Sequence, residues 1–175
     1  MNKLLVISAL GQDKPGIVKA LSKTILDNGG NICDSRMSVL GDEFALVMMV
    51  SCSSEVIANI ENSMFALQDT VGLTIICKQT AARHAADKRI PYEINIVAMD
   101  NPGIVHDVTD FLHDKHVNVE ELSTSTYSAP HTGTTMFSLD LSVSLPATLN
   151  VSTFKNEFLS FCDELNLDAM IQRLS

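Results

Sequence analysis

A six-residue stretch occurs twice in this sequence with almost the same letters: residues 13–18 read Asp-Lys-Pro-Gly-Ile-Val, and residues 100–105 read Asp-Asn-Pro-Gly-Ile-Val. An offset of 87 residues (100 − 13) aligns residues 13–32 with 100–119 without a gap and gives seven identities in these 20 positions. Such self-similarity is typical of a chain that folds as two copies of one unit. A chain of 175 residues is long enough for two hydrophobic cores of roughly 80 residues each.

Each copy of the stretch lies between a short apolar run and an amphipathic segment, which predicts a strand, a tight turn and a helix start. Proline suits the first helical position because its missing N–H would have no partner there, and glycine lets another group approach the backbone. The N–H groups of Gly16, Ile17 and Val18, together with the helix dipole, therefore form a candidate site for a carboxylate or phosphate. A purely structural turn is the alternative, since proline and glycine are ordinary turn residues.

Hydrophobic periodicity predicts the order β-α-β-β-α-β in each copy. In the first copy we expect a hairpin that turns at Gly41-Asp42 and a second helix capped by Ser53 or Ser54. In the second copy, apolar and polar residues alternate strictly over residues 137–145, which indicates a strand with one buried face. The predicted fold class is α+β: two ferredoxin-like units, each an antiparallel four-stranded sheet backed by two helices.

A break in this pattern separates the copies. We expect the first domain at residues 1–79, a linker at residues 80–91 and the second domain at residues 92–175. The segment from Lys78 to Pro91 is rich in alanine and carries more basic than acidic side chains. We interpret it as a solvated connector, with a basic contact surface as the alternative.

Composition limits the classes of partner. A formal net charge of -9 argues against direct nucleic-acid binding, which needs a basic face, and against anionic membranes. No apolar run reaches the 18 or so residues of a spanning helix. The apolar residues 4–10 resemble a signal peptide, but the second copy has an equivalent run, so we assign them to the fold. The four cysteines form no Cys-x-x-Cys pair and are typical of reduced core residues, which favours a cytoplasmic protein.

Residues His106, Asp110 and His113 lie at the spacing i, i+4, i+7 of a helical metal site, with His116 beyond them. The apolar stripe of that helix points to the opposite side, so we interpret the histidines as a solvent-facing surface and predict no metal ion. The sequence also lacks a Walker loop, a Gly-x-Gly-x-x-Gly fingerprint and a Gly-x-Ser-x-Gly elbow. We therefore predict no cofactor, no catalytic residues and no enzyme.

Polar residues around the first turn suggest how an amino acid would bind. Helix N–H groups can hold its carboxylate, while Asp13 or the side-chain oxygen of Asn31 accepts from its ammonium group. This hypothesis assumes that the loop after the first strand lies beside the start of the second strand. An exposed ion pair between Asp34 and Arg36 is the alternative use of that strand. The predicted ligand-binding residues of both copies are Asp13, Pro15, Gly16, Ile17, Val18, Asn31, Asp34, Asp100, Pro102, Gly103, Ile104 and Asn118.

An Asp-x-Pro-Gly-Ile-Val turn in a β-α-β-β-α-β unit resembles the ACT domain, a sensing module that commonly recognises amino acids. Residues 9–18, 31–37 and 40–44 also resemble regulators built from two ACT domains. That resemblance implies a regulator without its own DNA-binding domain, which contacts a DNA-bound activator protein and represses the glycine cleavage system with glycine as the signal. The second copy has His116-Val117 in place of Gly29-Gly30, so whether it binds the same ligand stays open.

Two other classes of function also fit the sequence. One is the regulatory subunit of an amino-acid metabolic enzyme, which would copurify with a catalytic chain. The other is a structural dimerisation module, which would bind no small molecule. Because ACT units often pair through their sheets or helices, the resemblance also implies a homo-oligomer.

Overall fold

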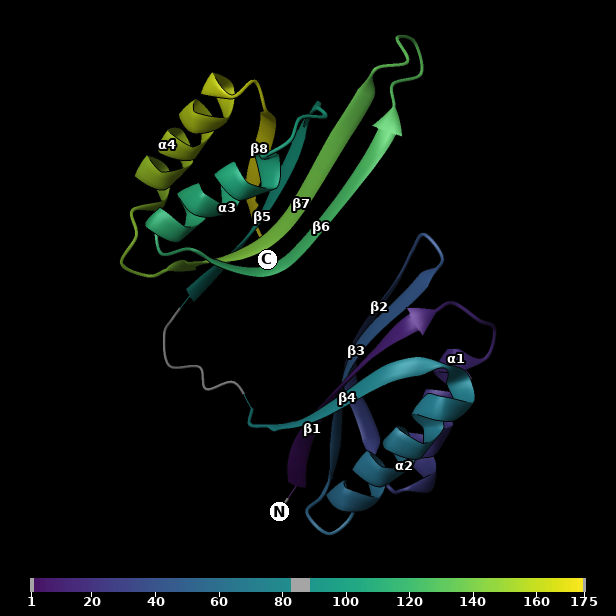
Figure 1. Cartoon of the computed structure of the whole chain (residues 1–175). Coiled ribbons are helices and arrows are strands. Elements are labelled where there is room, and N and C mark those ends of the chain that lie inside the picture. The colour runs from purple at the N-terminus through teal and green to yellow at the C-terminus, as the bar shows by residue number, and fades with distance from the viewer. Residues whose placement is uncertain (1, 83–88, 175) are drawn as a thin grey trace. The chain divides into compact units, whose positions relative to one another are not determined.

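The computed structural model describes residues 2–82 and 89–174 and divides into two compact units, Met1–His84 and Ala85–Ser175 (Figure 1). Each unit has the predicted order β-α-β-β-α-β. The first contains β1 (Asn2–Gln12), α1 (Ile17–Asp27), β2 (Asn31–Leu40), β3 (Glu43–Ser53), α2 (Ile57–Val71) and β4 (Leu73–Thr80). The second contains β5 (Arg89–Met99), α3 (Ile104–Asp114), β6 (Asn118–Ser128), β7 (Thr135–Pro146), α4 (Val151–Glu164) and β8 (Asp168–Arg173). The predicted fold class is confirmed.

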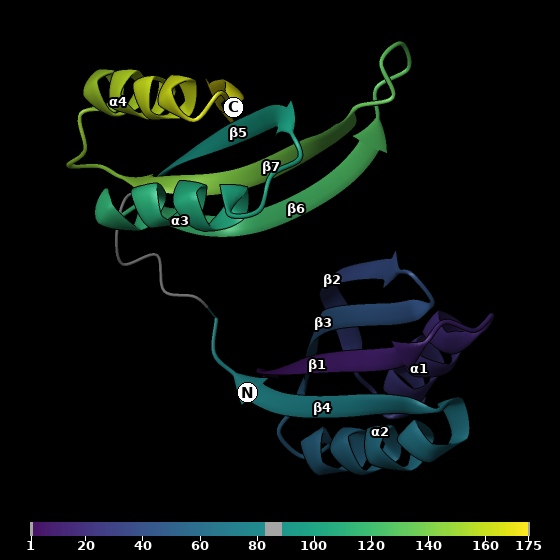
Figure 2. The same ribbon diagram turned by 45° about the horizontal axis from the view of Figure 1, so that its top comes forward.

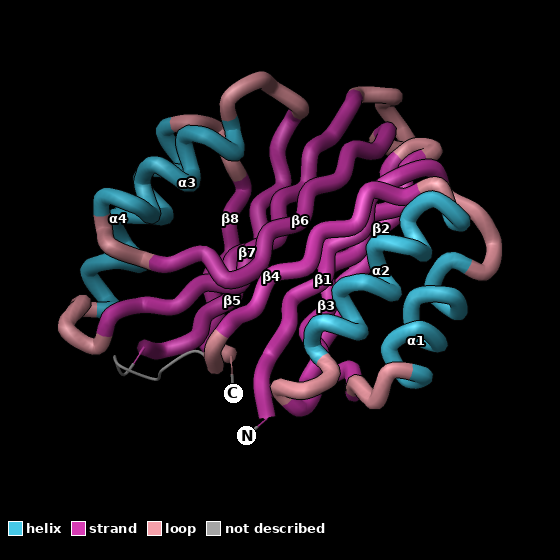
Figure 3. Tube along the Cα trace, turned by 60° about the horizontal axis from the view of Figure 1, so that its bottom comes forward, coloured by secondary structure: helices cyan, strands magenta, loops and turns pink. Residues whose placement is uncertain are grey.

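The sheet of the first unit has the strand order β2-β3-β1-β4, and every neighbouring pair is antiparallel (Figure 2). Helices α1 and α2 lie against one face of this sheet (Figure 3). The side chains of Ile17, Leu21 and Ile25 recur at helical spacing and are at most 3% exposed, so they attach α1 to the sheet. The hairpin turns at Gly41-Asp42, as predicted.

Two details of the first unit differ from the prediction. Helix α2 begins at Ile57 with Val56 as N-cap and without a side-chain cap, so neither Ser53 nor Ser54 caps it. Ser53 is still part of β3, where it pairs with Asn2. The closing strand, which the apolar run of residues 71–77 predicts, begins two residues later at Leu73, because α2 continues to Val71 and ends at Gly72 in the left-handed conformation (φ 74°).

The second unit repeats the topology, with the strand order β6-β7-β5-β8. The predicted buried face of β7 is confirmed, since the inward-facing leucines and valine of residues 139–145 are at most 1% exposed, but Ser144 on the other face is also buried (7% exposed). Phenylalanine rings gather between the two helices of this unit. Phe111 of α3 lies 4.7 Å from Phe161 and 5.5 Å from Phe158, measured between ring centroids. The two helices of this unit therefore meet through stacked and edge-to-face rings.

The expected linker coincides only in part with the irregular part of the chain. Strand β4 reaches Thr80, and β5 already begins at Arg89, which pairs with Pro146. The expected second domain starts three residues later, at Tyr92. Residues 83–88, the middle of the expected linker, lie outside the described residues. No helix in the described ranges 2–82 and 89–174 is long and apolar enough to cross a membrane.

Candidate functional site

The turn between β1 and α1 holds most of the predicted ligand-binding residues of the first unit. Gly16 is the N-cap of α1 and has φ 94°, a left-handed conformation that glycine adopts without strain. The backbone N–H of Asp13 donates to the carbonyl oxygen of Asp42 (2.9 Å), which ties this turn to the β2–β3 hairpin. The turn is therefore a fixed loop whose shape requires the glycine.

The N-terminus of α1 has no side-chain cap. Of the three N–H groups predicted to bind an anion, that of Ile17 points to the carbonyl oxygen of Lys14 at 3.4 Å, while those of Gly16 and Val18 have no acceptor among the described residues. The side chain of Ile17 is 3% exposed and belongs to the core, so only its backbone can contact a ligand. Uncapped N–H groups and the helix dipole attract an anion to this end.

The equivalent turn of the second unit has the same backbone but a different charge. Gly103 is the N-cap of α3 with φ 103°, and Asp100 N–H donates to the carbonyl oxygen of Thr135 (3.0 Å). Helix α3, however, carries Asp107 in its first turn, where the 87-residue offset places Ala20 in α1. A β-carbon at Gly103 would lie 3.6 Å from Asp107 Oδ2, so this carboxylate stands beside the N-terminus of α3. It makes no capping hydrogen bond, but its negative charge disfavours an anionic ligand at this end of the helix.

A second difference lies where the last strand of each unit begins. In the first unit, Gly11 packs on the α2–β4 turn so closely that a β-carbon there would lie 2.8 Å from the Gly72 carbonyl oxygen. Lys14 Nζ lies 3.5 Å from the position of a β-carbon at Gly72, the C-cap of α2, so the loop after β1 brings a positive charge to the α2–β4 turn. The loop that precedes α1 therefore carries a basic side chain that its counterpart before α3 lacks.

The second unit has a hollow of about 470 Å³ at the equivalent place. Ala98 and Asn101 stand where Gly11 and Lys14 are found in the first unit. The hollow is lined by Ala98, Met99, Asn101, Pro102, Ile104, Asp107, Leu165, Asn166 and Leu167. Its polar groups are two amides and one carboxylate, which suit a hydrogen-bond donor or a cation better than an anion.

The structure does not bring Asn31 and Asp34 to the first turn, so that part of the prediction is wrong. Both β1 and β2 are antiparallel to β3 and hence run in the same direction. Asn31 lies in the row of Leu4, eight residues before the end of β1 at Gln12. At about 3.4 Å per residue, this places Asn31 roughly 27 Å from the turn. The helix returns the chain to the end of the sheet at which β1 starts, so the end of β1 lies at the same edge of the sheet as the end of β2, with β3 between them.

The same geometry holds in the second unit. Asn118 pairs with Ser144, which pairs with Pro91 near the start of β5, while Asp100 follows the end of that strand. The predicted residues thus form two groups at opposite ends of each sheet. The turn group comprises Asp13, Pro15, Gly16, Ile17, Val18, Asp100, Pro102, Gly103 and Ile104, and the strand-start group comprises Asn31, Asp34 and Asn118.

Asp34 makes the ion pair that the sequence offered as its alternative role. Its Oδ1 accepts from Nη1 of Arg36, two residues along β2. The side chains are 67% (Arg36) and 57% (Asp34) exposed, so this pair contributes little to stability. The Asp34 carboxylate therefore already has a cationic partner.

The structure also shows the surroundings of the other reactive side chains, the histidines of α3 and the cysteines. His106, Asp110 and His113 are exposed on α3, and within residues 2–82 and 89–174 no three His, Cys, Asp or Glu side chains gather to hold a metal ion. Burial raises the pKa of the Cys77 thiol to about 11 and that of Cys162 to about 12, with further increases from the carboxylates of Glu61 and Asp163 respectively. These thiols are not nucleophiles at neutral pH.

Sequence reasoning did not single out Lys14 or Asp107. The signal was present in the repeat itself, because the same alignment that pairs Gly16 with Gly103 also pairs Lys14 with Asn101 and Ala20 with Asp107. Positions that differ between copies carry the electrostatic information. The identical letters describe only the turn that both copies share.

Comparisons with known proteins agree with this architecture. A model of the ACT domain matches residues 3–78, the first unit. The glycine cleavage system transcriptional repressor of Escherichia coli (strain K12) is 30% identical over 167 residues, which cover 95% of this chain and 88% of that protein.

Solved structures give the same result over the full length. A protein of unknown function from Galdieria sulphuraria aligns with a TM-score of 0.83 at 27% identity and covers 100% of both chains. A candidate glycine cleavage system transcriptional repressor aligns with a TM-score of 0.75 at 25% identity, covering 100% of this chain and 99% of its own.

Proposed function

Because the chain belongs to the ACT domain family, in which it matches a glycine cleavage system transcriptional repressor over nearly its whole length, we propose that it is an amino-acid-responsive regulator of transcription. In this proposal it has no catalytic activity and represses the glycine cleavage system, with glycine as the signal. It acts in the cytoplasm by contact with a DNA-bound activator protein. The net charge of -9 supports contact with a protein rather than with DNA.

The observation that carries the ligand part of this proposal is the first turn. It combines an uncapped helix N-terminus with a lysine, Lys14, in the preceding loop and has no acidic residue in the first helical turn. A free amino acid presents a carboxylate to such a site. The Asp13 carboxylate, at the start of the same turn, is available to the ligand's ammonium group. The proposed primary site is therefore the turn group of the first unit.

The binding energy of glycine sets the scale of the response. With five non-hydrogen atoms and a ceiling of about 1.5 kcal/mol per atom, its binding free energy is at most about 7 kcal/mol in magnitude, or micromolar affinity. A sensor of an abundant metabolite needs no tighter binding. Glycine changes contact with the activator only if it binds the two states of the regulator with different affinity.

Thermal unfolding in the presence of amino acids tests the proposal. A ligand at a hundredfold excess over its dissociation constant should stabilise the folded state by about 2.7 kcal/mol. We expect millimolar glycine to raise the midpoint of the wild type and of Gly103→Val, and to leave Gly16→Val unchanged. Both substitutions strain a residue with positive φ, so Gly103→Val controls for the strain itself.

Different outcomes separate the parts of the proposal. If no amino acid raises the midpoint, direct sensing by this chain is wrong, and regulation would depend on the partner protein alone. If Gly103→Val and not Gly16→Val loses the response, the site lies in the second unit. A mobility shift of DNA by the isolated chain near 150 mM salt would contradict the protein-contact mechanism.

A further inference from the structure

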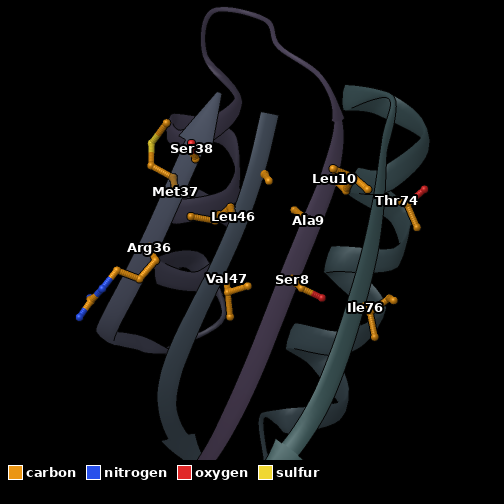
Figure 4. A pocket seen from close by; sticks show the side chains of 11 residues that line it. Ser8, Ala9, Leu10, Arg36, Met37, Ser38, Leu46, Val47, Thr74 and Ile76 are labelled. Carbon is orange, nitrogen blue, oxygen red and sulfur yellow. The ribbon is translucent and has the colours of Figure 1, made fainter. Parts of the chain in front are cut away.

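The hollow of about 470 Å³ between α3 and the α4–β8 turn has a different charge from the larger hollow of the first unit. That larger hollow, of about 500 Å³, lies on the sheet face opposite α1 and α2, and its charged lining side chain is the guanidinium of Arg36 (Figure 4). No lysine or arginine lines the hollow of the second unit, and its charged group is the carboxylate of Asp107. It is therefore a candidate site for a positively charged ligand.

The hollow lies beside a turn that is longer than its counterpart in the first unit. One residue, Gly72, separates α2 from β4, whereas residues 165–167 separate α4 from β8. In the first unit, the Gly72 carbonyl oxygen approaches Gly11 so closely that a β-carbon at Gly11 would lie 2.8 Å from it. Ala98, the counterpart of Gly11, carries that β-carbon. The second unit therefore has an open space where the first unit is closely packed.

A lysine side chain reaches the equivalent place in the first unit. Lys14 Nζ lies 3.5 Å from the position of a β-carbon at Gly72, which ends α2 in the left-handed conformation. The C-terminus of a helix carries partial negative charge, so a cation is favourable there. The first unit thus supplies its own ammonium group to the end of its second helix.

The second unit has the same helix end without the cation. Asn166 (φ 56°) follows the C-cap of α4 and corresponds to Gly72 (φ 74°). Each of the two precedes a buried leucine, Leu167 (4% exposed) and Leu73 (3% exposed) respectively, from which the chain enters the last strand. The 87-residue offset places the uncharged Asn101 at the position of the lysine, and α4 has no basic residue in its last turn.

Three polar side chains line the hollow, those of Asn101, Asp107 and Asn166. None of them makes a hydrogen bond within residues 2–82 and 89–174. Their carboxylate and amide oxygens are acceptors for an ammonium group, which has three N–H donors. The other lining residues are apolar and suit an aliphatic chain: Ala98, Met99, Pro102, Ile104, Leu165 and Leu167.

The charge of the whole second unit also attracts cations. Residues 89–174 contain 12 acidic and 4 basic side chains, which gives a formal net charge of -8 (4 − 12), compared with -9 for the whole chain. Such an excess of one sign raises the local concentration of oppositely charged ligands. The second unit therefore favours a cation both at the hollow and over its surroundings.

We propose that the hollow of the second unit binds an aliphatic primary amine in its ammonium form, which takes the place that the Lys14 side chain has in the first unit. The ammonium group donates to Asp107 and to the amide oxygens of Asn101 and Asn166, and the aliphatic chain lies against the apolar lining. A carboxylate on the ligand is unfavourable because Asp107 repels it. The site thus selects the opposite charge from the proposed glycine site.

Two-dimensional NMR of the ¹⁵N-labelled full chain tests the proposal. The probe is n-butylammonium chloride at constant ionic strength, and sodium butanoate and 1-butanol have the same four-carbon chain without the ammonium group. We expect the ammonium ion to shift the amide signals of Asn101, Asp107 and Asn166, but not that of Gly16, with a dissociation constant below about 10 mM. Butanoate and 1-butanol should bind at least about tenfold more weakly.

Substitutions in the hollow test how the amine is held. Asn101→Lys should abolish binding, because the new side chain brings its own ammonium group to the place of the ligand, whereas Asn101→Gln should retain binding. Asp107→Asn should weaken binding about tenfold, since it removes the charged acceptor. Asp110→Asn is the matched control: Asp110 is an exposed aspartate of the same helix that does not line the hollow, so the dissociation constant should stay within about twofold.

Four outcomes would overturn the proposal. The first is the absence of any shift in the second unit up to about 50 mM butylammonium. Equal shifts by butanoate or 1-butanol would show that the hollow does not select an ammonium group. Unchanged binding to Asn101→Lys would place the amine elsewhere, and equal losses in Asp107→Asn and Asp110→Asn would mean that only the overall charge matters. None of these variants alters the first unit, so the glycine proposal is judged separately.

Discussion

The two units share one backbone turn before their first helices but differ in the charge beside it. Neither helix N-terminus has a side-chain cap, but the loop before the first helix carries Lys14, whereas the first turn of the other helix carries Asp107. A helix N-terminus that already has its own carboxylate gains little from an external anion. A repeated motif can therefore preserve the backbone of a turn in both copies, while only one copy keeps a charge distribution that favours binding of a carboxylate ligand.

The units also divide the apolar surface differently. The first unit packs aliphatic and methionine side chains between its helices and its sheet. Further apolar side chains of this unit are exposed on the sheet face opposite α1 and α2. The second unit packs phenylalanine rings between its helices, and the sheet face opposite α3 and α4 is polar. The sheet of the first unit therefore exposes more apolar surface than the sheet of the second, and exposed apolar surface of this kind marks an interaction site.

The largest test of this comparison removes one core side chain from each unit. Phe158 and Met64 are both fully buried. Phe158→Ala should cost about 3–5 kcal/mol and Met64→Ala about 2–5 kcal/mol, because each leaves a cavity. Both tyrosines, Tyr92 and Tyr127, lie in the second unit, so tyrosine fluorescence reports on that unit while circular dichroism reports on both. We expect Phe158→Ala to shift the fluorescence midpoint in urea and Met64→Ala to leave it in place.

Equal shifts of the fluorescence midpoint in both variants would show that the units unfold as one cooperative block. That result would contradict the description of two separate cores. Phe65→Ala serves as the control, since this exposed side chain should change neither signal by more than about 0.5 kcal/mol.

The next largest difference that we expect between the two units is in the reactivity of their cysteines toward a labelling reagent. Cys33 is exposed in the first unit, whereas Cys162 is the cysteine of the second unit, is buried, and has a pKa of about 12. Since the thiolate is the reactive form, a pKa about three units above an ordinary thiol lowers reactivity at pH 8 about a thousandfold. Mass spectrometry after brief iodoacetamide treatment should find Cys33 modified and Cys162 intact.

The pH dependence of labelling has a definite sign. Because the Cys162 pKa is raised, its thiolate fraction should grow about tenfold per pH unit from pH 8 to pH 10. The thiol form stabilises the folded state below the ordinary thiol pKa, and this stability is lost as the pH rises toward 12. Rapid native labelling of Cys162 at pH 8 would mean that α4 opens readily, and labelling in urea controls for reagent quality.

Exchanging the charge between the two turns tests the ligand site without straining a glycine. Ala20→Asp gives α1 the carboxylate that α3 has, and Asp107→Ala removes it from α3. Because acids stabilise helix N-termini, Ala20→Asp should raise the unfolding free energy by about 0.3–1 kcal/mol. It should nevertheless abolish the roughly 2.7 kcal/mol of stabilisation expected at a hundredfold excess of ligand. A more stable variant that loses the ligand response cannot be explained by damage to the fold.

The reciprocal variant completes this comparison. Asp107→Ala should be slightly less stable than the wild type and, if charge alone distinguishes the turns, should bind a second glycine by calorimetry. A glycine response that survives Ala20→Asp would place the site elsewhere.

Much of the fold could be predicted from the sequence because local signals agree with one another. The repeat, the alternation along β7 and the hairpin at Gly41-Asp42 all reflect period and turn chemistry within a few residues. The start of α2 was harder to predict. A serine normally caps a helix, but Ser53 is held in β3 by its pairing across the sheet, and a tertiary contact thus overrides a local preference.

The site was predicted less well because it depends on which ends of strands meet. Asn31 and Asp34 follow the first turn closely in sequence, yet the length of α1 carries them to the far end of the sheet. The roles of Lys14 and Asp107 depend on how the α2–β4 and α4–β8 turns approach the first loop, which no local pattern specifies. The turn could be identified from the sequence, whereas the charged residues that lie near it could be identified only from the tertiary structure.

The smallest test compares one ion pair from each unit. Lys23 and Asp27 form an i,i+4 pair on α1 with side chains 67% and 53% exposed, while Lys115 joins α3 to Glu157 of α4 with exposures of 33% and 46%. Lys115 Nζ also lies 5.6 Å from the centre of the Phe111 ring.

Lys115→Met should therefore lower the free energy of unfolding by about 0.5–1 kcal/mol, whereas Lys23→Met should lower it by about 0.3 kcal/mol. A double-mutant cycle with Glu157→Gln separates the ion pair from the ring contact, because this substitution removes the carboxylate and leaves the Phe111 ring in place. The coupling energy of the ion pair should fall in 1 M salt. Equal costs for the two lysines would mean that the contact between α3 and α4 adds nothing to the aromatic packing beneath it.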